Sequence, residues 1–139
     1  MYKNNKKFKK HYKNSNTYQE EQLLPRKKKK FGQHFLRKQS VVDNMIDAVL
    51  IDQNTSILEI GCGDGFLTQA ILSQTKCKQL WSYEIDPEWA AVVGQKIKDS
   101  RLHLECKDIL AADFESEFGA EGPLVLLANL PYQITFPII

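Results

Sequence analysis

The segment SILEIGCGDG, residues 56–65, guides the interpretation of the rest of the chain. Residues 56–60 are a short, mostly apolar run of the kind found in a buried β-strand. Residues 61–65 carry glycine at every second position, and glycine permits the tight backbone turns that follow such a strand. Residues 66–72 then place apolar side chains at helical spacing. A strand, a glycine loop and a helix in this order predict the start of a βαβ unit.

Apolar periodicity extends this pattern in both directions. Further strands are predicted at 80–85, 102–106 and 124–128, further helices at 40–50 and 87–98, and a short helix or turn at 113–119. The alternation predicts an α/β fold, a Rossmann-like parallel sheet with flanking helices. The apolar residues 124–128 suit a strand covered on both faces. The chain stops on apolar residues, 136–139, after four strands, so we expect a domain truncated after strand four.

The spacing of the glycines indicates the kind of ligand. In parallel α/β sheets ligands bind at the carboxyl ends of the strands, which is where this loop falls. The dinucleotide fingerprint is G-x-G-x-x-G, and its third glycine would fall at Phe66. The observed G-x-G-x-G pattern therefore favours a nucleoside ligand such as S-adenosylmethionine.

Carboxylates lie at the end of the second predicted strand and just past the third. Glu84 directly follows apolar residues and could accept both hydroxyl hydrogens of a ribose. Asp86 precedes Pro87 and is interpreted as a helix cap. Asp108 could accept a hydrogen bond from the amine of a bound adenine. Glu59 could hold the ligand's ammonium group or bond backbone amides, and the sequence leaves both roles open.

The sequence Asn129-Leu130-Pro131-Tyr132 follows the fourth predicted strand. An aromatic amine is a poor nucleophile because its lone pair is delocalised into the ring. The Asn129 side-chain oxygen and the backbone carbonyl of Leu130 or Pro131 could each accept one N–H and free that lone pair. Pro131 stiffens the loop, and Tyr132 offers a ring face to an extruded base. These four residues are predicted to be catalytic through positioning and hydrogen bonds at the amine, without a metal.

Charge divides the chain near residue 30. Residues 1–30 hold eleven Lys and Arg against two Glu, whereas residues 31–139 hold eight Lys and Arg against fifteen Asp and Glu. The first segment has too few apolar residues to fold alone, so we expect a disordered basic tail that contacts RNA phosphates. Residues 31–139 form the predicted folded part, the N-terminal portion of a ligand-binding domain.

Composition excludes several other classes. No run approaches the roughly 18 apolar residues of a membrane span, and the charged start is no secretory signal, so we expect a cytoplasmic protein with no membrane partner. Cys62, Cys77 and Cys106 are an odd number at wide spacing, which predicts free thiols without a disulfide framework or a metal knuckle.

Taken together, the motifs resemble those of ribosomal RNA adenine dimethyltransferases. They occur in the order seen in that family and span roughly residues 30–139: FGQHFL at 31–36, LEIGCGDG at 58–65, YEID at 83–86, Asp108, and NLPY at 129–132. The resemblance implies a class I methyltransferase fold that binds S-adenosylmethionine. It also implies N6-dimethylation of adenines in small-subunit ribosomal RNA, by a monomer that binds this RNA or the small subunit.

The resemblance also implies roles for individual residues. The implied cofactor-binding set is His34, Leu36, Gly61, Gly63, Glu84, Asp108 and Asn129. In that set His34 and Leu36 line the methionine side of the cofactor, Glu84 holds the ribose and Asp108 the adenine. Asn129 and Tyr132 of the same motif bind the target base.

Two departures and three alternatives accompany this interpretation. Cys62 stands where the family often has proline, and the family continues into further strands and a small helical domain. A large-subunit adenine methyltransferase of the macrolide-resistance type shares the Asn129 motif, although residues 33–36 favour the small-subunit branch. A non-catalytic RNA-binding assembly factor is the second alternative. A nicotinamide-dependent oxidoreductase is the third, and Phe66 disfavours it.

Overall fold

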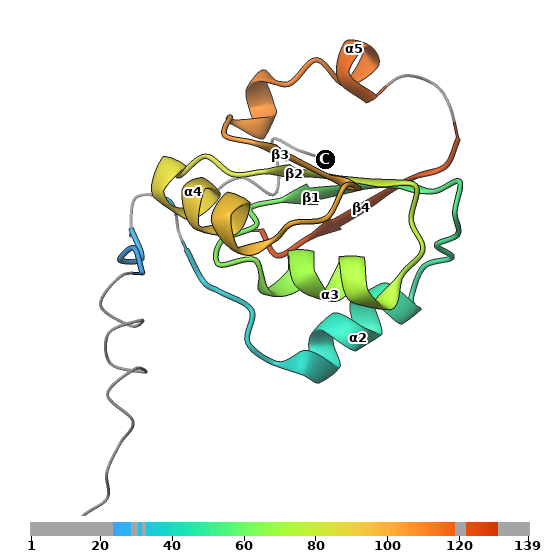
Figure 1. The fold of residues 1–139 in the computed structure, drawn as a ribbon, viewed down its shortest axis with the longest axis horizontal. Helices are drawn as coiled ribbons and strands as arrows, with labels where there is room; N and C mark the ends of the chain where they lie inside the picture. The colour runs from blue at the N-terminus through green and yellow to red at the C-terminus, as the bar shows by residue number, and fades with distance from the viewer. Residues whose placement is uncertain (1–23, 29–30, 32, 119–121, 131–139) are drawn as a thin grey trace, which may run out of the picture.

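Four parallel strands form one sheet in the order β3-β2-β1-β4 (Figure 1). The computed structural model describes residues 24–28, 31, 33–118 and 122–130. The strands are β1 (Ser56–Ile60), β2 (Gln79–Tyr83), β3 (Leu102–Glu105) and β4 (Leu124–Ala128). The predicted α/β fold with a parallel sheet is thus confirmed.

Strand β1 lies in the middle of the sheet because its residues suit burial on both faces. All five are buried, and Ile57 pairs with Leu80 of β2 on one side and Val125 of β4 on the other. The parallel register brings the carboxyl ends of the strands to one edge. The residues that follow β1, β2 and β4 therefore emerge close together, as the sequence predicted.

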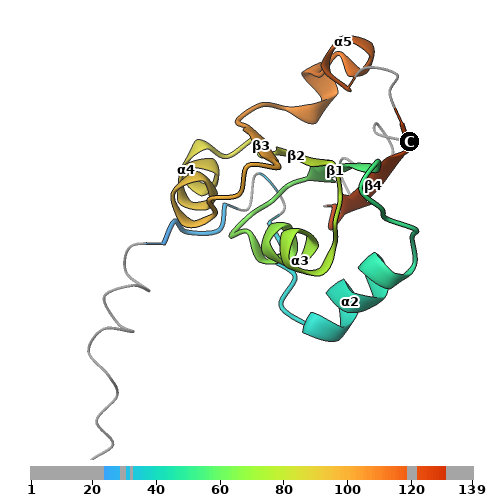
Figure 2. The same cartoon turned by 45° about the vertical axis from the view of Figure 1, so that its right-hand side comes forward.

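The helices lie on both faces of the sheet. They are α2 (Gln39–Asp47), α3 (Phe66–Gln74), α4 (Pro87–Lys96), the 3-10 helix η2 (Ile109–Ala111) and α5 (Phe114–Phe118). In Figures 1 and 2, α2 and α3 cover one face, whereas η2 and α5 lie across the other. None of the helices in the described part of the chain is long and apolar enough to span a membrane.

Most of the core lies between the sheet and helices α2, α3 and α4. Val42 of α2, Ile71 of α3 and Val93 of α4 are fully buried against Ile57 and Leu80. The side chains of Leu67, Ile71 and Leu72, predicted to point inward from α3, are each at least nine-tenths buried, which confirms the prediction. Burial of this apolar surface is the main source of stability for the layer that carries the glycine loop.

The opposite face of the sheet is more open. Tyr83 and Leu58 are buried there against Ile109 of η2. Leu124 and Leu126, however, are each 48% exposed. The prediction that residues 124–128 are covered on both faces is therefore wrong, because β4 is an edge strand of this sheet and carries an open face.

Element boundaries mostly follow the predictions. The first and fourth strands match exactly, and the short helix predicted near 113–119 is α5. The helix predicted at 40–50 ends at Asp47, because the chain turns there and leaves Leu50 97% exposed. All three cysteines are free: Cys62 and Cys77 are buried and Cys106 is exposed, as predicted.

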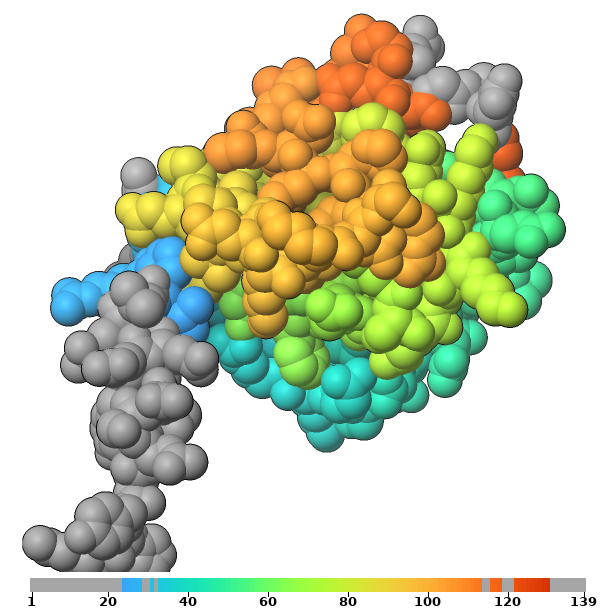
Figure 3. Space-filling view, in the orientation of Figure 1, coloured from blue at the N-terminus to red at the C-terminus, as the bar shows by residue number. Residues whose placement is uncertain are grey.

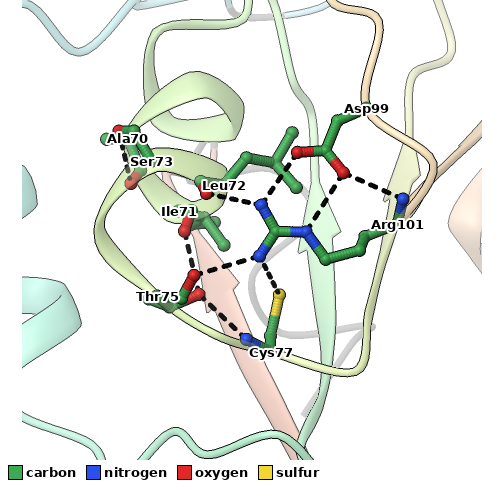
Figure 4. A network of polar contacts seen from close by, with 8 residues as sticks. All are labelled: Ala70, Ile71, Leu72, Ser73, Thr75, Cys77, Asp99 and Arg101. Carbon is green, nitrogen blue, oxygen red and sulfur yellow. Dashed lines mark hydrogen bonds and ion pairs between the residues drawn. The ribbon is translucent and has the colours of Figure 1, made fainter.

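Arg101 joins the end of α3 to the start of β3 (Figure 4). Its guanidinium donates to the carbonyl oxygens of Leu72 at 2.6 Å and Thr75 at 3.0 Å, and it pairs with Asp99 at 2.8 Å. The last carbonyl groups of a helix have no hydrogen-bond donor within the helix, and Arg101 supplies that donor at the end of α3. The hydrogen bond from Arg101 also lowers the pKa of Asp99.

Replacing Arg101 with glutamine is expected to destabilise this fold by about 2 kcal/mol, because charged hydrogen bonds to two carbonyls and one carboxylate are lost. Urea denaturation measures the loss. Lys76→Gln is the matched control, since Lys76 is exposed and lies in the loop after α3 that Arg101 contacts, and its unfolding free energy should change by less than about 0.5 kcal/mol. Equal unfolding free energies for the two variants would show that the Arg101 contacts add no stability.

Candidate functional site

One cavity of about 370 Å³ opens at the carboxyl edge of the sheet. Its walls come from residues 31 and 33–36, the loop after β1, the end of β2, the loop after β3 and the residue after β4. Every residue predicted to bind the cofactor lines it: His34, Leu36, Gly61, Gly63, Glu84, Asp108 and Asn129. The volume lies in the range of small-molecule sites in proteins.

The glycine loop forms the floor of this cavity. Gly61 has φ +76° and Gly63 has φ +53°, a region that side chains other than glycine rarely adopt. A Cβ atom on Gly61 would meet nothing within 4 Å, so its backbone is open to a close approach by a ligand. A Cβ atom on Gly63 would instead lie 2.9 Å from the ring of Phe35. The two glycines therefore serve different purposes: one faces open space and the other admits a packed aromatic ring.

The carboxylate of Glu84 lies in the cavity wall at the end of β2. One oxygen accepts a hydrogen bond from the Gly63 backbone N–H at 2.8 Å, and the other accepts from the Asp86 N–H at 2.9 Å. Burial raises the pKa of Glu84 above its ordinary value, although these two hydrogen bonds oppose the shift. Each carboxylate oxygen has a second lone pair, so Glu84 can still accept two hydroxyl hydrogens.

Asp86 caps helix α4, as predicted. Its carboxylate accepts from the Glu88 backbone N–H at 3.1 Å. The sequence did not predict its other partners, Lys28 at 2.9 Å and Gln33 at 3.1 Å. These two contacts fasten the segment before α2 to the start of α4.

Asp108 both caps η2 and lines the cavity. One of its oxygens accepts from the Leu110 backbone N–H at 3.0 Å. The cap fixes the side chain at the end of the loop after β3. Among the described residues no contact is found for its other oxygen, which is therefore available to a donor such as an exocyclic amine.

Asn129 is held by a residue 95 positions away in the sequence. Its amide nitrogen donates to the backbone carbonyl of His34 at 2.7 Å. This bond leaves the side-chain oxygen as an acceptor at the rim of the cavity. Leu130 packs on the core of the open face instead of lining the cavity. Pro131 and Tyr132 lie outside the described residues.

Several cavity-lining residues were missed by sequence reasoning, and two of them, Tyr83 and Lys107, share one partner. Tyr83 donates its hydroxyl hydrogen to Glu117 of α5, and Lys107 forms an ion pair with the same carboxylate. The hydrogen bond from Lys107 and, to a smaller extent, that from Tyr83 lower the pKa of Glu117 to about 2. The only signal in the sequence for the ion pair between Lys107 and Glu117 was that Lys107 directly precedes the predicted site residue Asp108.

Glu59 lies under the site in a role that the sequence did not predict. Its carboxylate is fully buried and accepts from the hydroxyls of Thr68 at 2.7 Å and Ser82 at 2.8 Å, rather than from backbone amides. It does not line the cavity. Burial raises its pKa to about 7. The contacts join β1 to β2 and α3 directly beneath the glycine loop.

The raised pKa of Glu59 predicts a pH-dependent stability. The folded protein holds the Glu59 proton more tightly than the unfolded chain does. The stability that this bound proton adds to the folded state is therefore complete below pH 4.5 and is lost as the pH rises through about 7. Glu59→Gln removes the titration. Its unfolding free energy should therefore gain up to about 3 kcal/mol relative to the unaltered chain between pH 4.5 and pH 8. Urea denaturation at both pH values measures this, and a constant difference would contradict it.

The fold and the position of the cavity define a class of protein. A parallel sheet with flanking helices is the fold of class I methyltransferases, and solved structures of methyltransferases share it. A dimethyladenosine transferase from Plasmodium falciparum is 28% identical, with a TM-score of 0.63 over 76% of this chain and 36% of that one. The 23S rRNA methyltransferase ErmE is 25% identical, with a TM-score of 0.64 over 76% of this chain and 41% of that one.

Sequence comparison identifies the family. Residues 25–139 match the family described as Ribosomal RNA adenine dimethylase, and the chain belongs to this family. Two proteins named Ribosomal RNA small subunit methyltransferase A are each 36% identical to it. The one from Mesomycoplasma hyopneumoniae aligns over 83% of this chain and 42% of its own length. The one from Alcanivorax borkumensis aligns over 82% and 40%. The chain thus spans about two fifths of the length of these curated relatives.

Proposed function

We propose that the whole protein uses S-adenosylmethionine to dimethylate N6 of adenines in small-subunit ribosomal RNA. The observation that carries the proposal is the convergence of Glu84, Asp108 and Asn129 on one cavity from the ends of three different strands. Similar proteins from two bacteria, named small-subunit methyltransferases, support the choice of RNA.

The donor and acceptor set of the cavity fits S-adenosylmethionine. Glu84 would accept the ribose hydroxyl hydrogens, and Asp108 would accept from the adenine amine. The backbone at Gly61 is open to close approach, because no atom lies within 4 Å of the position a Cβ would take. His34 and Leu36 would lie along the methionine part of the molecule, on the wall formed by the segment before α2.

Asn129 is the proposed catalytic residue of the described chain. S-adenosylmethionine supplies, when bound, an activated methyl group on a sulfonium sulfur. The oxygen of Asn129 would accept an N–H of the target adenine and return its lone pair to the nitrogen. The bond from Asn129 to the His34 carbonyl fixes which end of the amide faces the substrate. This preorganisation stabilises the transition state without a later rearrangement. The carbonyl of Leu130 or Pro131 and the ring of Tyr132 remain proposed partners of the same base.

The basic segment is proposed to supply affinity for RNA. Residues 1–30 carry eleven Lys and Arg, and such charges bind phosphates without regard to sequence. Choice of the target adenines would then rest on the site itself, in a protein proposed to act as a monomer.

Methylation of purified RNA tests the proposal. The full-length protein is incubated with labelled S-adenosylmethionine and unmodified small or large ribosomal subunits, and the modified nucleotides are mapped. N6,N6-dimethyladenosine in small-subunit RNA is the expected product. Methylation of the large subunit alone would favour a large-subunit adenine methyltransferase, the alternative that the similarity to ErmE supports. No methylation of either subunit, together with binding of RNA, would favour an assembly factor.

A further inference from the structure

Four side chains join the basic segment to the start of helix α4. The amine of Lys28 lies 2.9 Å from Asp86 and 3.0 Å from Glu88. The amide of Gln33 donates to the second oxygen of Asp86 at 3.1 Å and accepts from the Lys28 backbone N–H at 2.7 Å. We call Lys28, Gln33, Asp86 and Glu88 the clasp. Figure 3 shows residues 24–28 in blue beside the yellow α4.

The clasp is centred on a buried carboxylate. The side chain of Asp86 is 0% exposed, and that of Lys28 is 28% exposed. Burial would raise the pKa of Asp86, but the hydrogen bonds from Lys28 and Gln33 outweigh it and lower the pKa below its ordinary value. A buried carboxylate that loses its cation is strongly destabilised, so Lys28 has a specific partner to neutralise. Lys28 is therefore committed to the folded part, and Lys27 beside it lies over the ring of Phe35, 4.8 Å from the ring centroid.

The clasp is connected to the cavity from two sides. Asp86 donates its backbone N–H to the carboxylate of Glu84 at 2.9 Å. Gln33 is itself a cavity-lining residue and begins the segment that carries His34 and Phe35. Phe35 packs edge-on against Trp89 of α4, with ring centroids 4.7 Å apart. Holding this segment on α4 therefore positions one wall of the cavity against the carboxylate at the end of β2.

We propose that Lys28 is a positioning residue for the cofactor: by neutralising Asp86 it docks residues 33–36 on α4 and keeps the cavity wall in place. The role rests on the proposed function, because it concerns the binding of S-adenosylmethionine. It also divides the basic segment by function, since Lys28 serves the cofactor site whereas Arg26 is exposed and has no side-chain contact among the described residues.

Arg26 is the matched control for this division. It lies two residues from Lys28, carries the same charge and is exposed, and no side-chain contact is found for it among the described residues. Arg26→Gln and Lys28→Gln therefore remove one charge each from the same segment. Lys28→Arg keeps the charge and tests whether the cation is what matters.

Titration of the full-length variants with S-adenosylmethionine is the first test. Lys28→Gln should weaken binding about tenfold and raise the KM for S-adenosylmethionine by a similar factor, with kcat and the KM for RNA within about twofold. Arg26→Gln should leave cofactor affinity unchanged, and Lys28→Arg should restore most of it. Equal cofactor affinity for Lys28→Gln and Arg26→Gln would overturn the proposal.

Fluorescence of Trp89 is the second test and needs no activity. The chain has two tryptophans, so Trp81→Phe leaves Trp89 as the only reporter, and Trp89 is 2% exposed under Phe35. Adding Lys28→Gln should shift its emission to longer wavelength as the segment lifts away, whereas adding Arg26→Gln should not. An unshifted spectrum would overturn the docking role. If the unaltered protein binds no S-adenosylmethionine, the proposed function fails; if it binds and Lys28→Gln binds equally well, only the role of Lys28 fails.

Discussion

Replacing Asn129 with alanine is expected to lower kcat for adenine methylation by about 1,000-fold. The reason is that alanine cannot accept the N–H of the target amine, so the lone pair stays delocalised. Cofactor affinity should fall by no more than about threefold, because Asn129 lies at the rim while Glu84 and Asp108 still line the cavity. Single-turnover methylation and calorimetric titration measure the two quantities separately.

Asn44→Ala is the control for this experiment, since Asn44 is an exposed residue of α2 away from the cavity. It should retain full turnover. Turnover by Asn129→Ala within about tenfold of the unaltered protein would remove Asn129 from the catalytic role.

The second large effect is expected at Glu84. Glu84→Gln should weaken binding of S-adenosylmethionine by about 100-fold or more, because two charge-assisted hydrogen bonds to the ribose are lost. The amide also offers one oxygen where the carboxylate offers two, so its NH₂ group must face the backbone N–H of Gly63 or of Asp86. The glycine loop then loses one of its contacts. Calorimetric titration of both proteins with S-adenosylmethionine measures the effect.

Glu105→Gln provides the matched control, because Glu105 ends the neighbouring strand β3 and is exposed. It should bind S-adenosylmethionine as tightly as the unaltered protein. Tight binding by a folded Glu84→Gln variant would show that the ribose is held elsewhere. Circular dichroism of both variants separates a lost contact from a lost fold.

Much of the fold was predictable because each strand is a short apolar run between breaks. The apolar run 56–60 indicated the bounds of β1, and Pro123 marked the start of β4. The end of α2 was not predictable from periodicity. Val49 and Leu50 continue the apolar pattern, but the chain turns after Asp47 and Leu50 stays exposed. A local pattern does not contain the tertiary contacts that end a helix.

Glu84, Asp108 and Asn129 were predictable as cavity-lining residues for a topological reason, whereas His34 and Leu36 were implied by the family resemblance. Parallel strands end at one edge, so residues that directly follow them meet without any knowledge of side-chain packing. The pairing of Lys28 with Asp86 was not predictable, because a run of five cations at 26–30 gives no signal as to which one pairs with that carboxylate. The contacts of Glu59 with Thr68 and Ser82 were missed for a similar reason, since they join three elements across one face of the sheet.

The central claim is that this cavity binds S-adenosylmethionine. Calorimetric titration of the chain with S-adenosylmethionine, with NAD as the competing ligand class, tests it most directly. Saturable binding of S-adenosylmethionine at one site, lost in Glu84→Gln, and no binding of NAD is the predicted result. Binding of NAD in preference to S-adenosylmethionine would contradict the account.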